Sequence, residues 1–124
     1  MKTILFAMIL SLSGCCTVAK HQIIVENVKD IMAPVLDRHD AYVSLDSSLN
    51  NVMKAIALGQ SEKIRVAIKG INCVHVDVIG KLVEDIAKRH DAYVEGDNRT
   101  SPVEKRIALR STALLRATIE EARK

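Results

Sequence analysis

The chain repeats itself. The hexapeptide Arg-His-Asp-Ala-Tyr-Val occupies residues 38–43 and returns unchanged at residues 89–94, an offset of 51 residues. At that offset, and without a gap, residues 25–69 align with residues 76–120, and 15 of the 45 aligned positions are identical. We infer a tandem duplication. A unit of about fifty residues is one supersecondary element that needs its neighbour to bury its apolar face.

Each copy has the hydrophobic spacing of a helical hairpin. In the first half of each copy, apolar residues recur every three or four positions, and the repeated His39 and His90 lie on the same faces. The first face consists of Val25, Val28, Ile31, Met32, Val35, Leu36, Tyr42 and Val43, and the second of Val76, Ile79, Leu82, Val83, Ile86, Tyr93 and Val94. Pro34 interrupts the first face, where proline permits either a kink or a late helix start.

A second helix is expected in each copy after a polar turn, at residues 44–48 and 95–99. The clearest helix start follows the later turn. Ser101 fits the N-cap, Pro102 the first helical position and Glu104 the acidic position of a capping box. The apolar face of this helix continues along Val103, Ile107, Leu114, Leu115 and Ile119.

The junction between the copies also fits short strands. Residues 63–69 and 73–78 alternate polar with apolar side chains, and Gly70 lies between them, a pattern typical of a β-hairpin. However, residues 63–69 align without a gap with part of the fourth helix, so we interpret this segment as helical.

These patterns predict an all-α fold, in which two tandem helical hairpins form a small antiparallel four-helix bundle. The expected helices lie near residues 23–43, 50–69, 74–94 and 102–122. In an up-down arrangement the first and third helices run parallel. His39 and His90 would then face each other at one level of the bundle.

The N-terminus has the pattern of an export signal. Lys2 precedes an apolar segment over residues 4–12, which is shorter than the ~20 residues of a membrane-spanning helix. Leu12-Ser13-Gly14-Cys15 follow, and this order of one aliphatic and two small residues before a cysteine resembles the lipobox of bacterial lipoproteins. The resemblance implies that residues 1–14 are removed. The Cys15 thiolate, as the nucleophile, then accepts the diacylglyceryl group.

The resemblance also implies a location and a division of the chain. Several acyl chains anchor a protein stably in a membrane. Because Cys16 and Thr17, rather than Asp, follow the lipidated cysteine, we expect the outer membrane, facing the periplasm. Residues 15–22 then form a lipidated tether. Residues 23–124 form the helical domain, made of repeats at about 23–72 and 73–124.

Charge and cysteine content narrow the possible partners. Removal of residues 1–14 lowers the formal net charge from +3 to +2, because Lys2 is the only charged residue lost. This charge is too small to indicate nucleic-acid binding. In an oxidising compartment Cys16 and Cys73 can pair, but Cys73 equally fits a small buried hydrophobic residue.

The repeated hexapeptide invites a chemical interpretation. His39, Asp40, His90 and Asp91 carry imidazole and carboxylate groups that suit a transition metal. The simpler interpretation, which we prefer, is a structural corner in which the polar side chains satisfy a helix end and turn. The chain has no Gly-rich phosphate loop, Cys-x-x-Cys pair or metalloprotease motif. We therefore expect no enzymatic activity and no cofactor.

The favoured function is that of a non-catalytic envelope lipoprotein, anchored by its lipid, whose helical domain binds an envelope protein or has a structural role. One alternative is a phage or prophage lipoprotein for host lysis or superinfection exclusion, which the chain resembles in layout only. Another is a metal- or ligand-binding lipoprotein using the paired His-Asp corners. The chain also permits homo-oligomers formed by pairing two-helix hairpins.

Overall fold

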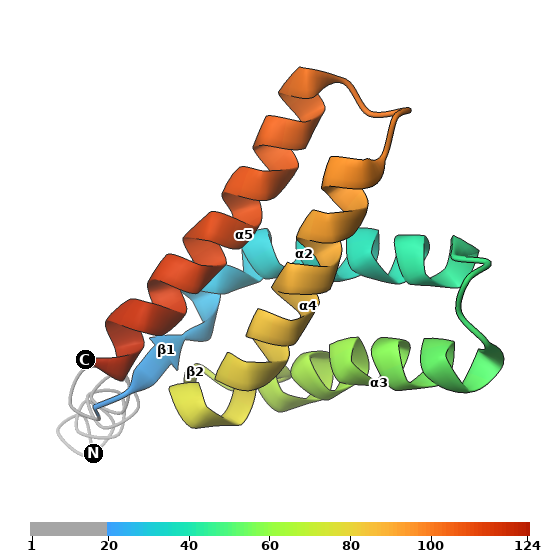
Figure 1. The fold of residues 1–124 in the computed structure, drawn as a ribbon. Helices are drawn as coiled ribbons and strands as arrows, with labels where there is room; N and C mark the ends of the chain where they lie inside the picture. The colour runs from blue at the N-terminus through green and yellow to red at the C-terminus, as the bar shows by residue number, and fades with distance from the viewer. Residues whose placement is uncertain (1–19) are drawn as a thin grey trace, which may run out of the picture.

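The computed structural model describes residues 20–124, which form four helices with a common core (Figure 1). The helices are α2 (Val25–Leu45), α3 (Asn51–Ile68), α4 (Val76–Gly96) and α5 (Pro102–Arg123). The α2–α3 and α4–α5 pairs are the two predicted hairpins, and the four helices contact one another. The prediction of a small four-helix bundle is confirmed.

A short ribbon of two strands joins the repeats. The alternation over residues 73–78 indicated its second strand, but no pattern indicated the pairing with residues 22–24. Strand β1 (Gln22–Ile24) pairs antiparallel with β2 (Cys73–His75), with Ile23 opposite Val74. Helices α2 and α4 therefore begin two residues later than expected. Of the two alternating segments, residues 63–69 are helical as predicted, whereas β2 is a strand whose partner is β1.

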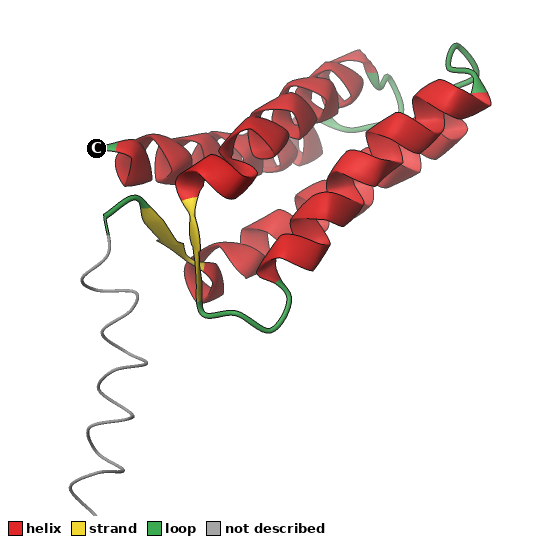
Figure 2. Cartoon of the chain, turned by 90° about the horizontal axis from the view of Figure 1, so that it is seen from below, coloured by secondary structure: helices red, strands yellow, loops and turns green. Residues whose placement is uncertain are grey.

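The ribbon relates the two repeats by an approximate two-fold axis. The offset of 51 residues maps β1 onto β2, and the antiparallel pairing is symmetric about Ile23 and Val74. The amide of Val25 donates to the carbonyl of Asn72 at 2.9 Å, and the equivalent Val76 amide donates to His21 at 2.7 Å. Figures 1 and 2 show the two hairpins crossing, so that α2 and α4 are not parallel neighbours of an up-down arrangement.

The core lies between the crossing hairpins and the ribbon, and it is aliphatic. Its buried members are Ile23, Val25, Val28, Met32, Val35, Leu36, Ile64, Val74, Val76, Ile79, Val83, Ile86, Leu115 and Ile119. Ile64 and Leu115 occupy equivalent positions of the two repeats and are both buried. Burial of such side chains contributes about 1.5–3 kcal/mol each, and it is the main force that holds the hairpins together.

Helix starts follow the capping chemistry that the sequence indicates. The side chain of Ser101 accepts from the Glu104 amide at 3.2 Å, with Pro102 at the first helical position, so the predicted N-cap is confirmed. At the equivalent start, Asn50 accepts from the Met53 amide at 2.8 Å. Helix α2 continues through Pro34. Within residues 20–124, no helix has both the length and the apolar character needed to cross a bilayer.

Candidate functional site

The repeated hexapeptides meet where α2 and α4 cross near the two-fold axis. His39 of α2 and His90 of α4 are both 0% exposed. A buried imidazole is stable only when its ring nitrogens have hydrogen-bond partners. The surroundings of the two rings therefore show what the hexapeptide is for.

Each histidine is paired with an arginine of the other repeat. A guanidinium nitrogen of Arg89 lies 2.8 Å from Nε2 of His39, and one of Arg38 lies 2.9 Å from Nε2 of His90. The two contacts are exchanged by the two-fold axis. The Arg-His pair at the start of the hexapeptide therefore links the hairpins to each other.

These arginines determine which ring nitrogen of each histidine carries the proton. A guanidinium only donates hydrogen bonds, so Nε2 of His39 accepts from Arg89 and its proton resides on Nδ1. That Nδ1–H donates to Asp40 Oδ1 at 2.9 Å, and His90 donates to Asp91 in the same way at 3.0 Å. Burial lowers the pKa of both imidazoles below the ordinary 6.5, although the adjacent carboxylates act in the opposite direction. Both histidines are neutral at pH 7.

The aspartates extend each contact to the second helix of their own hairpin. Asp40 accepts from the Ser61 hydroxyl at 2.6 Å and from Arg65 at 2.7 Å. The equivalent contacts of the second repeat join Thr112 and Arg116 to Asp91, at 2.6 and 2.7 Å. Burial raises the pKa of both carboxyls, but these hydrogen bonds outweigh it and keep the pKa below its ordinary value. The carboxylates therefore remain ionised.

The tyrosines of the hexapeptide bind the turn of the opposite hairpin. Tyr42 donates to Asp97 at 2.8 Å and Tyr93 donates to Asp46 at 2.7 Å. The two rings stack with their centroids 5.3 Å apart. Burial and the neighbouring carboxylate raise the pKa of Tyr93 to about 12 and also raise that of Tyr42.

The geometry makes the hexapeptide pair a joint between the repeats. Both ring nitrogens of His39 and His90 are occupied, and each Nε2 faces a cation, which is unfavourable for a metal ion. Within the described residues, no three His, Cys, Asp or Glu side chains converge to hold a metal. Ser61 donates to Asp40, and its burial removes it from any substrate. The arrangement suits a structural network, in which every buried side-chain polar atom of residues 20–124 has a partner.

Sequence reasoning missed the partners outside the hexapeptide. They are Asp46, Ser61 and Arg65 in the first repeat, and Asp97, Thr112 and Arg116 in the second. The alignment carried their signal, because two of these three equivalent positions are identical and the third keeps a hydroxyl.

A second candidate site is the outward face of the second helix in each hairpin. Seven large apolar side chains on these helices, Met53 among them, are between 45% and 68% exposed, and the other six lie along the outward faces. They are Val52, Ile56 and Val66 on α3, and Val103, Ile107 and Leu114 on α5, and we call the two sets the outer stripes. Val52 and Ile56 are equivalent to Val103 and Ile107, so the exposure recurs in both repeats.

The outer stripe of α5 corrects part of the sequence interpretation. Val103, Ile107 and Leu114 were predicted to share the core face with Leu115 and Ile119, but only the last two are buried. The remaining buried residues of α5 are Ala108 and Thr112. The core face of α5 is therefore a single narrow row, whose members are spaced three or four residues apart.

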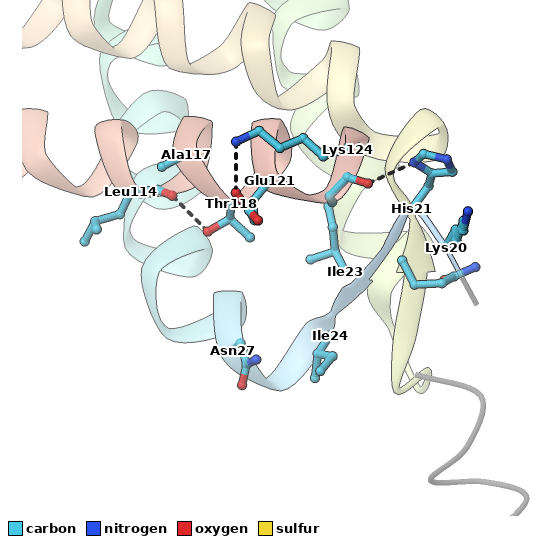
Figure 3. Close-up of a pocket in the computed structure, with 12 residues that line it drawn as sticks. Lys20, His21, Ile23, Ile24, Asn27, Leu114, Ala117, Thr118, Glu121 and Lys124 are labelled. Atoms are coloured by element: carbon cyan, nitrogen blue, oxygen red, sulfur yellow. Dashed lines mark hydrogen bonds and ion pairs between the residues drawn. The ribbon is translucent and has the colours of Figure 1, made fainter. Parts of the chain in front are cut away.

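A hollow of about 710 Å³ lies where the described chain begins, between β1, the start of α2 and the end of α5 (Figure 3). Aliphatic residues and lysines line it, including Ile24, Leu114, Lys20 and Lys124. The His21 imidazole donates from Nδ1 to the carbonyl of Ala122 at 3.0 Å, which joins the two ends of the described chain. His21 and Glu121 also line the hollow.

The anchor predictions concern residues outside this description. The signal peptide at residues 1–14, the lipidation site Cys15 and the possible disulfide partner Cys16 all precede residue 20. Cys73 lies in β2 and is half-buried. Lipidation and the pairing of Cys16 with Cys73 therefore stay predictions.

Comparisons with known proteins give no relative: no family model, no curated protein and no solved structure matches this chain.

Proposed function

We propose that the chain is a lipid-anchored envelope protein whose helical domain binds an amphipathic helix of another envelope protein through the outer stripes. It acts by binding, without catalysis. The observation that carries the proposal is the pair of outer stripes, which are exposed in the domain formed by residues 20–124.

The spacing of the outer stripes matches that of helices that receive a partner helix. Val52 and Ile56 are four residues apart, and Val66 lies two heptads after Val52, so all three face one side of α3. Single exposed apolar residues are ordinary on a protein surface. Their alignment along one face of both outer helices is instead typical of helix-in-groove and helix-on-helix recognition.

Gly59 supports a close approach of a partner to α3. It lies on the outer stripe, one heptad after Val52 and one before Val66. A Cβ at this position would meet no atom within 4 Å, so the protein's own packing does not require glycine. Glycine inside a helix costs about 0.5–1 kcal/mol relative to alanine. The domain's own packing does not explain why this costly glycine is present. A docked helix that approaches α3 closely at this position would explain it.

The proposed anchor places the domain against the membrane. Four residues lie between Cys15 and Lys20, the first described residue, and the five steps of chain span at most about 18 Å when fully extended. A lipid on Cys15 would therefore hold the ribbon end of the domain at the surface of the proposed outer membrane, with the stripes available to neighbouring envelope proteins.

Crosslinking in intact envelopes tests the binding proposal. The lipidated protein and an Ile56→Glu/Ile107→Glu variant are crosslinked and purified in parallel, with Glu62→Lys as a control for a charge change at an exposed polar position beside the α3 stripe. We expect one reproducible partner with the unaltered protein and the control, and its loss with the stripe variant. Capture of the same partner by the stripe variant, at equal expression and helicity, would refute the proposed surface.

Gly59→Ala gives an independent readout. We expect it to raise the free energy of unfolding by about 1 kcal/mol, since alanine is the better helix former. The same change should weaken crosslinking to the partner, because the added methyl group separates the helices. A variant that is more stable and binds equally well would remove Gly59 from the binding surface.

The adjacent cysteines provide a matched test of the anchor. Cys15→Ser should abolish incorporation of a labelled fatty acid and release the protein from the membrane fraction, whereas Cys16→Ser should keep both. Membrane retention and labelling of the Cys15→Ser variant would refute the lipid anchor without affecting the binding surface.

A further inference from the structure

The contacts between the two hairpins are reciprocal. Arg38 meets His90 as Arg89 meets His39, and the ribbon is symmetric about its centre. The tyrosine–aspartate contacts are exchanged in the same way. Each hairpin therefore carries both the donor and the acceptor of every contact of this kind.

An interface in which each partner presents the same surface is the form that homodimers use. Here it occurs inside one chain. The contact set does not depend on whether the opposing hairpin belongs to the same molecule. Only the connection between the hairpins makes the interface intramolecular.

That connection is short and exposed. Residues 69–72 link α3 to β2, and all four are exposed. Gly70 has φ = +70°, the left-handed region in which a β-branched residue is strained. The chain needs this conformation to fold back on itself, whereas a connection that extends to another molecule is free of that requirement.

We propose that each hairpin is a docking surface for the opposite hairpin of a second copy of this chain, so that the protein forms a dimer by hairpin exchange. In the dimer, the first hairpin of each copy pairs with the second hairpin of the other copy. The ribbon, the Arg–His contacts and the Tyr–Asp contacts all form between copies. The dimer is closed, because no interface remains unpaired, and it leaves the outer stripes exposed.

A pair of cysteine variants reports exchange directly. Gln22 and His75 face each other across the ribbon and are half-buried. All three native cysteines are changed to serine, which also makes the test independent of the anchor. One full-length copy then carries Gln22→Cys and the other His75→Cys, and the two are mixed and oxidised. A chain carrying both substitutions is the control for the geometry, since it should close an internal disulfide.

Hairpin exchange predicts a disulfide between the two different copies. Mixing copies that both carry Gln22→Cys should give none, because Gln22 does not face its own equivalent. The absence of the mixed disulfide, while the control chain closes its internal bridge, would overturn the proposal.

Substitution of Gly70 measures the same equilibrium without cysteines. Gly70→Val strains the folded-back connection, so we expect the dissociation constant of the dimer to fall at least tenfold in sedimentation equilibrium. Gly70→Asn, which tolerates the left-handed region, should resemble the unaltered chain. A Gly70→Val variant that is helical by circular dichroism yet equally monomeric would also overturn the proposal.

Discussion

The two buried histidines should make the protein lose stability in mild acid. An unfolded chain binds a proton at each histidine as the pH falls through about 6.5. In the folded protein, burial and the facing arginine keep His39 and His90 neutral to lower pH. Because the unfolded state then binds more protons, the free energy of unfolding is fully present above pH 6.5 and falls below it.

The structure sets the size of this effect. Each proton bound only by the unfolded state changes the free energy of unfolding by about 1.4 kcal/mol per pH unit. Two such sites give a limiting slope of about 2.7 kcal/mol per pH unit. The carboxyls of Asp40 and Asp91 do not contribute between pH 5 and 6.5. Their pKa is lowered from 3.8, so their stabilisation is lost only in stronger acid.

Urea unfolding followed by circular dichroism, repeated from pH 7.5 to 5, measures the slope. Glutamine can accept from the arginine and donate to the aspartate without titrating. We therefore expect His39→Gln to halve the slope that these two histidines cause, and His39→Gln/His90→Gln to abolish it. A stability that is flat in this range, or a slope that survives in the double variant, would refute the assignment of both histidines as neutral acceptors.

Three further predictions concern single contacts. The Tyr93 phenol, whose pKa is raised to about 12, should ionise at lower pH in an Asp46→Asn variant, as ultraviolet difference titration will show. Ile64→Ala and Leu115→Ala should each lower the free energy of unfolding by about 2–5 kcal/mol in urea titrations, because both side chains are buried at equivalent positions; a neutral effect at either would contradict the core. Ser101→Ala should cost about 1 kcal/mol in thermal unfolding by removing the cap of α5, and an unchanged midpoint would deny the cap that role.

The four helices were predictable because each has a long periodic face and the fourth has a recognisable start at Ser101 and Pro102. The ribbon was only half indicated: residues 73–78 alternate, but the three residues of β1 are too few for a period and share no identical residue with β2. At residues 63–69 the alternation of polar and apolar residues suggested a strand, but the segment is helical. Ile64 and Ile68 lie four residues apart and hence on one side of a helix. The gap-free alignment gave the correct interpretation there.

The hexapeptide was identified from sequence, but its contacts were not. Sequence reasoning placed His39 opposite His90. In the structure the hairpins cross, and each histidine instead contacts an arginine of the other repeat. That crossing depends on the ribbon, whose pairing has no signal in the chain. The outer stripes were missed for a related reason, since an apolar residue on a helix indicates a contact without stating whether the partner is internal.

The contact between His21 and Ala122 brings the two ends of the described chain close together, so that they could be joined covalently. Joining Lys124 to Lys20 by a short linker and opening the chain at Gly70 would produce a circular permutant with the hairpins in reverse order. Every contact of the core, the ribbon and the hexapeptides would be kept, because the linker joins ends that already lie close together and the new ends lie in an exposed connection. The order of the hairpins along the chain then has little bearing on folding; it decides which hairpin is next to the N-terminal segment.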